Sequence, residues 1–137
     1  MSQEFLDAFR AGYEAAQAAF NQGDYDSAYA RLAPDVEYHP LPRLLESGVK
    51  RGKEEMRAFF ESAREGNDWK PQAQEYIDAG DAAAIVRLRG TTVGRTTRIA
   101  NTLEFYELVE FGSDGLIRRI RDYEKREDAL EAAGLSE

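Results

Sequence analysis

The sequence predicts an α+β protein, because the spacing of its apolar residues changes from helical to strand-like near the middle of the chain. In the first third, Phe5, Phe9, Tyr13, Ala16 and Phe20 recur at steps of three and four residues, which places them on one helix face. In the second half, apolar and polar residues alternate, as in half-buried strands. Helices followed by an antiparallel meander form an α+β order.

Local signals mark where the helices begin and end. Ser2 is the expected N-cap of the first helix, which stops before Gly23, and Asp24 caps a short second helix that Pro34 closes. Gly134, followed by Leu135, ends the last helix in a Schellman arrangement. The remaining expected segments are a strand at Asp35–His39, a loop at 41–50, a helix at 52–66, strands at Trp69–Asp78, Ala82–Val93, Arg98–Phe111 and Leu116–Lys125, and a helix at 126–133.

Composition narrows the classes of function. The 137 residues fit one domain, residues 1–137, with a single core. The formal net charge of −8 argues against nucleic acid binding, which depends on Lys and Arg. No apolar run is long enough to cross a membrane, and the acidic, polar start is unlike a signal peptide. The sequence has no cysteine, so we expect no disulfide and no thiolate chemistry, and a cytoplasmic location.

Pairing Val93 with Thr96 and Gly112 with Gly115 gives one consistent apolar face of the predicted sheet. In this register Glu107 lies opposite Ile120, and Phe105 lies opposite Asp122. The inward residues are Ala84, Val86, Leu88, Leu103, Phe105, Val109, Phe111, Leu116 and Ile120. The opposite face carries Arg87, Arg89, Glu104, Tyr106, Glu110, Arg119, Arg121 and Tyr123, and it fits either a solvated surface or a homodimer interface.

Four polar residues share the inward face: Asn101, Glu107, Asp122 and Glu124. A buried carboxylate is costly unless it is paired or protonated, so these residues indicate a ligand cavity with a polar floor. The alternative is that Asp122 and Glu124 lie at a strand end in water. A one-residue bulge would reverse which residues face inward at the far end of the strand, and the cavity prediction would then fail there.

His39, the only histidine, ends the first expected strand just before Pro40. A lone histidine is more often structural or exposed than catalytic. A metal site is not expected, because there is no second histidine and the carboxylates have no recognisable ligand spacing. There is also no glycine-rich phosphate loop, and no serine stands at a strand-to-helix elbow. Trp69 and Phe60 are expected in the core.

Taken in order, a series of short motifs resembles the SnoaL-like families of the nuclear-transport-factor-2 (NTF2) superfamily. The matching segments are 20–25 (FNQGDY), 32–40 (LAPDVEYHP), 52–60 (GKEEMRAFF), 80–81 (GD), 89–91 (RGT), 114–117 (DGLI) and 129–135 (ALEAAGL). The resemblance implies a cone, in which a strongly curved antiparallel sheet wraps around helices and encloses a pocket. It also implies a homodimer. Known members include ketosteroid isomerases, polyketide cyclases, epoxide hydrolases and dehydratases.

The isomerase pattern can be carried over one position at a time. The general base of the isomerases falls at His39. Their protonated acid, whose raised pKa lets it donate a hydrogen bond to an oxyanion, falls at Glu107. The phenolic donor falls at Ala16, which has no hydroxyl; Tyr13 lies one turn away. The acid that relatives carry after the last strand falls at Lys125. These two changes argue against steroid isomerisation, whereas a His39/Glu107 pair could still perform acid–base chemistry.

Two functions are therefore expected about equally. The first is an enzyme without a cofactor that acts on a small hydrophobic carbonyl compound, with His39 as base and Glu107 or Asp122 as acid. The second is a non-catalytic binding protein with the same pocket. A third, a protein–protein module using the outer sheet face, is less favoured. The predicted pocket lining is Tyr13, Phe20, Phe60, Trp69, Asn101 and Phe105.

Overall fold

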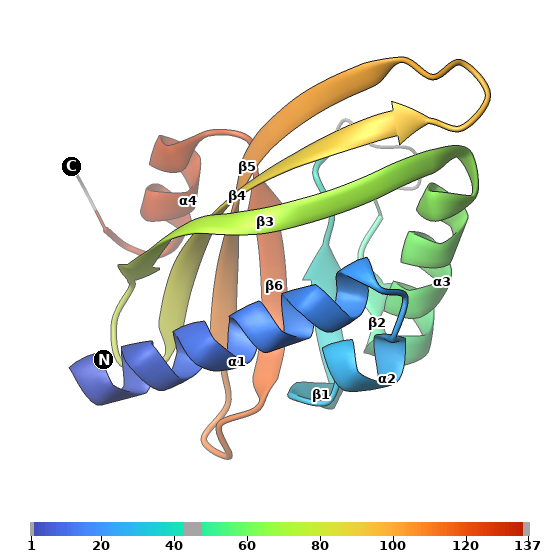
Figure 1. Cartoon of the computed structure of the whole chain (residues 1–137). Helices are drawn as coiled ribbons and strands as arrows, with labels where there is room; N and C mark the ends of the chain where they lie inside the picture. The colour runs from blue at the N-terminus through green and yellow to red at the C-terminus, as the bar shows by residue number, and fades with distance from the viewer. Residues whose placement is uncertain (1, 43–47, 136–137) are drawn as a thin grey trace.

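The computed structural model describes residues 2–42 and 48–135, which form helices packed on a curved, unclosed sheet (Figure 1). The helices are α1 (Gln3–Asn21), α2 (Tyr25–Ala28), α3 (Gly52–Gly66) and α4 (Arg126–Ala132). The strands are β1 (Leu32–His39), β2 (Lys50–Arg51), β3 (Asn67–Asp78), β4 (Ala83–Gly94), β5 (Ala100–Phe111) and β6 (Ile117–Tyr123). None of the described helices is both long enough and apolar enough to cross a bilayer. Part of the loop predicted at 41–50 lies outside the described residues.

The predicted caps at Ser2 and Asp24 and the predicted stops at Gly23 and Gly134 are confirmed. The Ser2 hydroxyl accepts from the Phe5 amide at 3.1 Å, and Asp24 accepts from the Ser27 amide at 3.2 Å. Gly23 and Gly134 both have positive φ, of 81° and 78°. The Leu135 amide donates to the Leu130 carbonyl at 2.8 Å, which is the long bond of a Schellman motif.

The strand order is β2-β1-β6-β5-β4-β3, with β1 parallel to β6 and every other neighbouring pair antiparallel. The prediction that Pro34 ends the second helix is wrong, since β1 starts at Leu32 and continues through Pro34. Pro34 lies where the pairing of β1 with β6 is irregular, between Leu32 and Glu37. A proline has no amide hydrogen to donate, so an irregular stretch tolerates it.

The predicted faces of the sheet are correct, but the predicted partners across it are not. Val93 pairs with Ala100 rather than Thr96, because the turn is longer and includes Arg98 in a left-handed conformation (φ 61°). At the next turn the Gly112 amide donates to the Leu116 carbonyl, while the Gly112 carbonyl accepts from the Gly115 amide. After a bulge at the Glu110/Phe111 step, Glu107 pairs with Asp122 rather than with Ile120. Away from the turns both shifts are of an even number of residues, so those residues keep their predicted side of the sheet. Next to the turn, Ile117 instead takes the inward position opposite Phe111.

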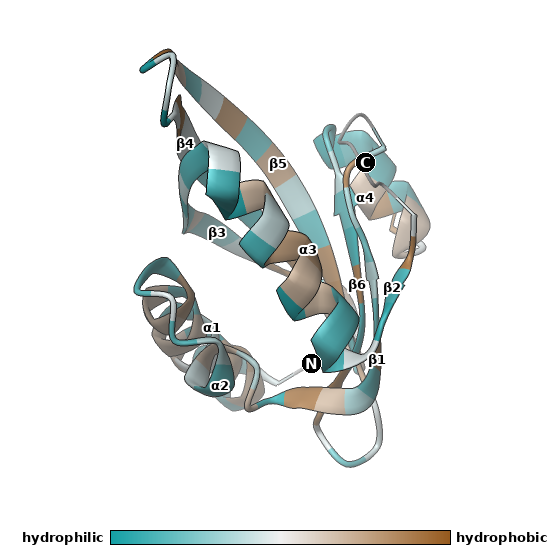
Figure 2. Ribbon diagram, turned by 90° about the vertical axis from the view of Figure 1, so that its right-hand side faces the viewer, coloured by the Kyte–Doolittle hydropathy of each residue, from teal (hydrophilic) through white to brown (hydrophobic). Residues whose placement is uncertain are grey.

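The sheet separates two packed layers, with α1–α3 on its inner face and α4 on its outer face (Figure 2). The inner layer contains the predicted apolar face, including fully buried Val86 and Val109. The outer layer was not predicted: α4 covers Ile85 and Leu108, which are buried, and packs against Tyr106 and Tyr123. The surface predicted as a dimer interface around those tyrosines is therefore partly covered by the chain's own last helix.

Candidate functional site

A cavity of about 660 Å³ lies between the inner face of the sheet and the helices α1–α3. Its wall is mainly aromatic and aliphatic, with residues from α1, α3 and all the long strands. The apolar lining includes Phe20, Met56, Phe60, Trp69, Leu88 and Phe105. Such a wall fits a small, largely apolar molecule and leaves orientation to a few polar groups.

One glycine gives the aromatic wall its shape. Gly90 on β4 faces inward beneath Trp69, and a Cβ at this position would lie 2.6 Å from the indole ring and 2.9 Å from the Pro71 Cα. The absent side chain lets Trp69 lie close to the sheet, with its ring 6.0 Å from that of Phe105. The glycine therefore fixes the position of the Trp69 ring in the cavity wall.

Two carboxyl groups stand side by side on the inner face. Glu107 on β5 pairs directly with Asp122 on β6, and both side chains line the cavity. Residues directly opposite on neighbouring antiparallel strands have adjacent side chains. The register predicted Ile120 opposite Glu107, so the sequence did not bring these two acids together.

Each carboxyl group accepts a hydrogen bond from a tyrosine on another element. The Tyr13 hydroxyl of α1 donates to Glu107 Oε1 at 2.6 Å, and the Tyr38 hydroxyl of β1 donates to Asp122 Oδ2 at 2.6 Å. The second oxygen of Asp122, Oδ1, is buried and has no donor among the described residues. The result is a row of four polar side chains, Tyr13, Glu107, Asp122 and Tyr38, in a cavity whose wall is mainly apolar.

Burial and mutual repulsion shift the pKa values of these groups. Burial raises the pKa of Asp122 well above its usual value, and the neighbouring charge of Glu107 raises it further. Burial also raises the pKa of Glu107, although hydrogen bonds from Asp122 and Tyr13 oppose the shift. Burial and the adjacent carboxyl groups likewise raise the pKa of both tyrosines, so both remain neutral donors.

These raised pKa values favour a state in which the two carboxyl groups share one proton. Asp122 has the more strongly raised pKa and holds the proton, and its unpaired Oδ1 can direct that proton at Glu107 or at a ligand. No arginine, lysine or histidine of the described chain forms an ion pair with either group. The pair titrates as one unit and not as two independent acids.

Five of the six predicted lining residues do line the cavity: Tyr13, Phe20, Phe60, Trp69 and Phe105. Asn101 does not. It pairs with Thr92 near the far end of β5 and is exposed, because the longer β4–β5 turn moves it away from the enclosed part of the sheet.

The structure does not bring His39 to Glu107 and Asp122. Residues alternate along β1, and the inward position belongs to Tyr38, whose ring packs 5.8 Å from Phe59 and 5.3 Å from Phe60. His39 therefore points the other way, with its Nε2 3.4 Å from Glu37 Oε1. The prediction that His39, Glu107 and Asp122 share one pocket is corrected: His39 is not among the described residues that line it.

Two tyrosines of the site were missed or undervalued from sequence. Tyr38 could have been found from the alternation of β1, since Val36 and Tyr38 share its inward face. Tyr13 supplies the phenol that Ala16 lacks, because its hydroxyl reaches Glu107 from one turn away. Within the described chain, no group of three or more potential ligand side chains could hold a metal ion.

Comparison with known families then identifies the relationship. Residues 4–120 match the model of the SnoaL-like domain. The chain belongs to the SnoaL-like family. A comparison with curated protein sequences finds no match.

Solved structures of this family's wider NTF2-like fold resemble the chain along most of its length. A Mycobacterium tuberculosis protein in complex with estradiol-17β-hemisuccinate is 16% identical, with 85% of this chain and 93% of that chain covered and a TM-score of 0.72. A putative polyketide cyclase from Xanthomonas campestris is 19% identical, with 93% and 98% covered and a TM-score of 0.69. The Δ5-3-ketosteroid isomerase of a Mycobacterium species is 18% identical, with 88% and 94% covered and a TM-score of 0.68. At these identities the likeness shows the fold alone.

Proposed function

We propose that this SnoaL-like protein performs acid–base chemistry on a small, mostly apolar carbonyl compound, with Glu107 and Asp122 as the reacting pair. The observation that supports this most strongly is the position of two adjacent carboxyl groups with raised pKa values in an apolar cavity. Groups whose pKa values are shifted toward neutral are suited to exchange protons with a ligand.

The two acids have different roles in this proposal. Glu107, a carboxylate oriented by the Tyr13 hydroxyl, removes a proton from the carbon next to the carbonyl group. As that C–H bond breaks, its electron pair forms a carbon–carbon double bond, and the carbonyl becomes an enolate. Asp122, oriented by Tyr38, donates a hydrogen bond to the enolate oxygen. Glu107 then returns the proton to the same carbon or to a conjugated one, so nothing is consumed.

Exchange of hydrogen for deuterium tests this step without the natural substrate. We expect the wild-type protein in D₂O to accelerate loss of the α-protons of 2-tetralone, a small apolar ketone, as followed by NMR. Glu107→Gln should slow the exchange roughly 100-fold or more, because it removes the base. Asp122→Asn should slow it about 10-fold or more, because an amide is a weaker donor to an enolate.

Glu110→Gln is the matched control, since Glu110 lies on the same strand but on the outer face, where it binds Arg119. It should exchange at the wild-type rate. Equal rates in the wild type, Glu107→Gln and Asp122→Asn would reject the catalytic role of the pair.

A second candidate is a binding protein that uses the same cavity without turnover. Two observations favour it. Both carboxyl groups already accept a hydrogen bond from a tyrosine, and His39 points away from the cavity toward Glu37. Calorimetry with 2-tetralone separates the two candidates. Heat of binding that depends on Asp122, without accelerated exchange, would support storage or transport over catalysis.

A further inference from the structure

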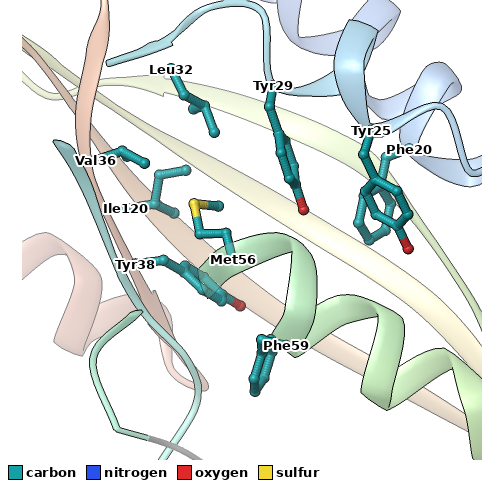
Figure 3. Packing of buried hydrophobic residues seen from close by; sticks show 9 residues of the cluster. All are labelled: Phe20, Tyr25, Tyr29, Leu32, Val36, Tyr38, Met56, Phe59 and Ile120. Carbon is teal, nitrogen blue, oxygen red and sulfur yellow. The ribbon is translucent and has the colours of Figure 1, made fainter. Parts of the chain in front are cut away.

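Tyr29 presents a second polar group to the same cavity. It directly follows α2, its side chain lines the cavity, and only 8% of the residue is exposed. Its hydroxyl is buried and has no hydrogen-bond partner among the described residues. Figure 3 shows the ring reaching from the end of α2 toward Met56 and α3, with the hydroxyl leading.

An unpaired buried hydroxyl is unfavourable, because it loses its bonds to water and gains none in return. The adjacent tyrosine, Tyr25, does not remove the cost: its ring lies tilted 5.7 Å from that of Tyr29, but no hydrogen bond joins the two hydroxyls. Burial and the nearby Tyr25 raise the pKa of Tyr29, so the group remains a neutral hydroxyl that both donates and accepts.

Among the described residues that line the cavity, two buried polar atoms have no hydrogen-bond partner, and they come from different elements. One is Asp122 Oδ1 on β6, at the carboxyl pair, and the other is the Tyr29 hydroxyl at the end of α2. The apolar side chains of Met56 and Ile120 belong to the cluster that contains Tyr29. Polar atoms of a site that lack partners in the protein mark where a ligand places its own polar atoms.

We infer that the ligand has two oxygen functions at separate points of an apolar body: a carbonyl or phenolic oxygen at the Glu107–Asp122 pair, and a hydroxyl or carbonyl oxygen at Tyr29. This rests on the proposed function for the first oxygen only. A molecule with a single oxygen satisfies the carboxyl pair and leaves the Tyr29 hydroxyl unpaired. Tyr29 thus selects difunctional ligands from the many apolar molecules that fit.

Pairs of probes that differ in one oxygen test the inference. We would measure dissociation constants by calorimetry for 4-hydroxybiphenyl against 4,4′-dihydroxybiphenyl, and for estradiol against its 17-deoxy analogue. In the wild type at least one dihydroxy probe should bind about three- to tenfold more tightly than its partner, the gain from one net hydrogen bond. Tyr29→Phe should abolish that gain and leave the monohydroxy probes unchanged.

Tyr76→Phe is a matched control, because it also removes a buried tyrosine hydroxyl, but Tyr76 is not among the described residues that line the cavity. It should keep the full difference between the probes. A difference that persists in Tyr29→Phe, or that is absent from the wild type for both pairs, would overturn the inference. A loss of ligand-free stability in Tyr29→Phe with an unchanged probe difference would assign the hydroxyl to a bound water instead.

Failure of the proposed function gives a separate result. If Asp122→Asn leaves the affinity of the monohydroxy probes unchanged, the carboxyl pair does not bind the first oxygen. The effect of Tyr29 on the dihydroxy probes would still be measured in that case. Conversely, probes that lose affinity in Asp122→Asn but show no dependence on Tyr29 would retain the carboxyl pair and reject the second oxygen.

Discussion

Glu107 and Glu110 lie on the same strand, three residues apart, in opposite electrostatic surroundings. On the outer face, Glu110 accepts two bonds of 2.8 Å from Arg119, and Arg121 adds a third contact at 2.9 Å. Burial alone would raise the pKa of Glu110, but the bonds and charges of the two arginines outweigh it and lower the pKa. On the inner face, Glu107 meets only a second acid and a tyrosine, and its pKa is raised.

The difference shows what alternation along a strand can do. The outer face pairs its charges, as Glu75 does with Arg87 at 3.2 Å and with Arg126 at 3.1 Å. Those carboxylates remain ionised and hold strands and α4 together. No cation of the described chain forms an ion pair with Glu107 or Asp122 on the inner face, and this is why we propose that these two acids exchange protons with a ligand. Structural ion pairs and the carboxyl pair that we propose to be reactive are thus built from the same residue types on β5 and β6.

The largest expected effect comes from adding a third carboxylate to the inner face. Val86 is fully buried and lies directly opposite Glu107. Val86→Asp should cost about 4 kcal/mol or more and unfold the domain, as circular dichroism would show, because no cation is present to pair with the new charge. Thr91→Asp adds the same charge to the exposed outer face of the same strand and should cost no more than about 1 kcal/mol. Similar losses in both variants would contradict the contrast between the faces.

The second expected effect is on the pH dependence of the free energy of unfolding, to which Asp122 on the inner face and Glu110 on the outer face contribute in opposite directions. The raised pKa of Asp122 stabilises the fold below the unfolded-state pKa of about 3.9, and the contribution is lost as the pH rises toward the folded-state pKa. Asp122→Asn should therefore match the wild type at acidic pH and be more stable at pH 7. The difference is about 1.4 kcal/mol for every unit by which the folded-state pKa exceeds the unfolded one.

Glu110→Gln should show the reverse dependence. The lowered pKa of Glu110 stabilises the fold above the unfolded-state pKa, and the contribution is lost as the pH falls through the folded-state pKa. The variant should be about 0.5–1 kcal/mol less stable than the wild type at pH 7, since solvent screens the partly exposed pair, and equal to it at acidic pH. Urea titrations between pH 3 and pH 8 measure both variants. Parallel profiles for the two would show that the faces do not differ.

A smaller loss of stability is expected at Gly90, where the inner face has no room for a side chain. Gly90→Ala should push Trp69 away from the sheet and cost about 1–3 kcal/mol in thermal unfolding, because the Pro71 backbone on the other side cannot move freely. Gly66→Ala places the same methyl group where nothing lies within 4 Å and should cause no loss. If Gly90→Ala is as stable as the wild type, the indole is not held against this glycine.

A feature could be predicted from the sequence when the residues that determine it lie close together along the chain. Caps such as Ser2 and Asp24 depend on residues three positions away, so they were predictable. The faces of the sheet were predictable because an alternating pattern survives any even shift. The pairing of Glu107 with Asp122 was not, since it depends on a bulge and on the backbone of distant turns.

The smallest expected effect concerns His39, where local pattern and family position disagreed. The family position suggests an inward base, whereas packing of Tyr38 against Phe59 and Phe60 turns His39 outward, toward Glu37. His39→Ala should therefore change 2-tetralone exchange less than twofold and stability by no more than about 0.5 kcal/mol, because a half-exposed contact of 3.4 Å between a histidine and a carboxylate contributes little. Tyr38→Phe, the neighbouring inward residue, removes the donor to Asp122 and should slow exchange several-fold. Loss of exchange in His39→Ala with normal exchange in Tyr38→Phe would reverse the assignment and make His39 the base.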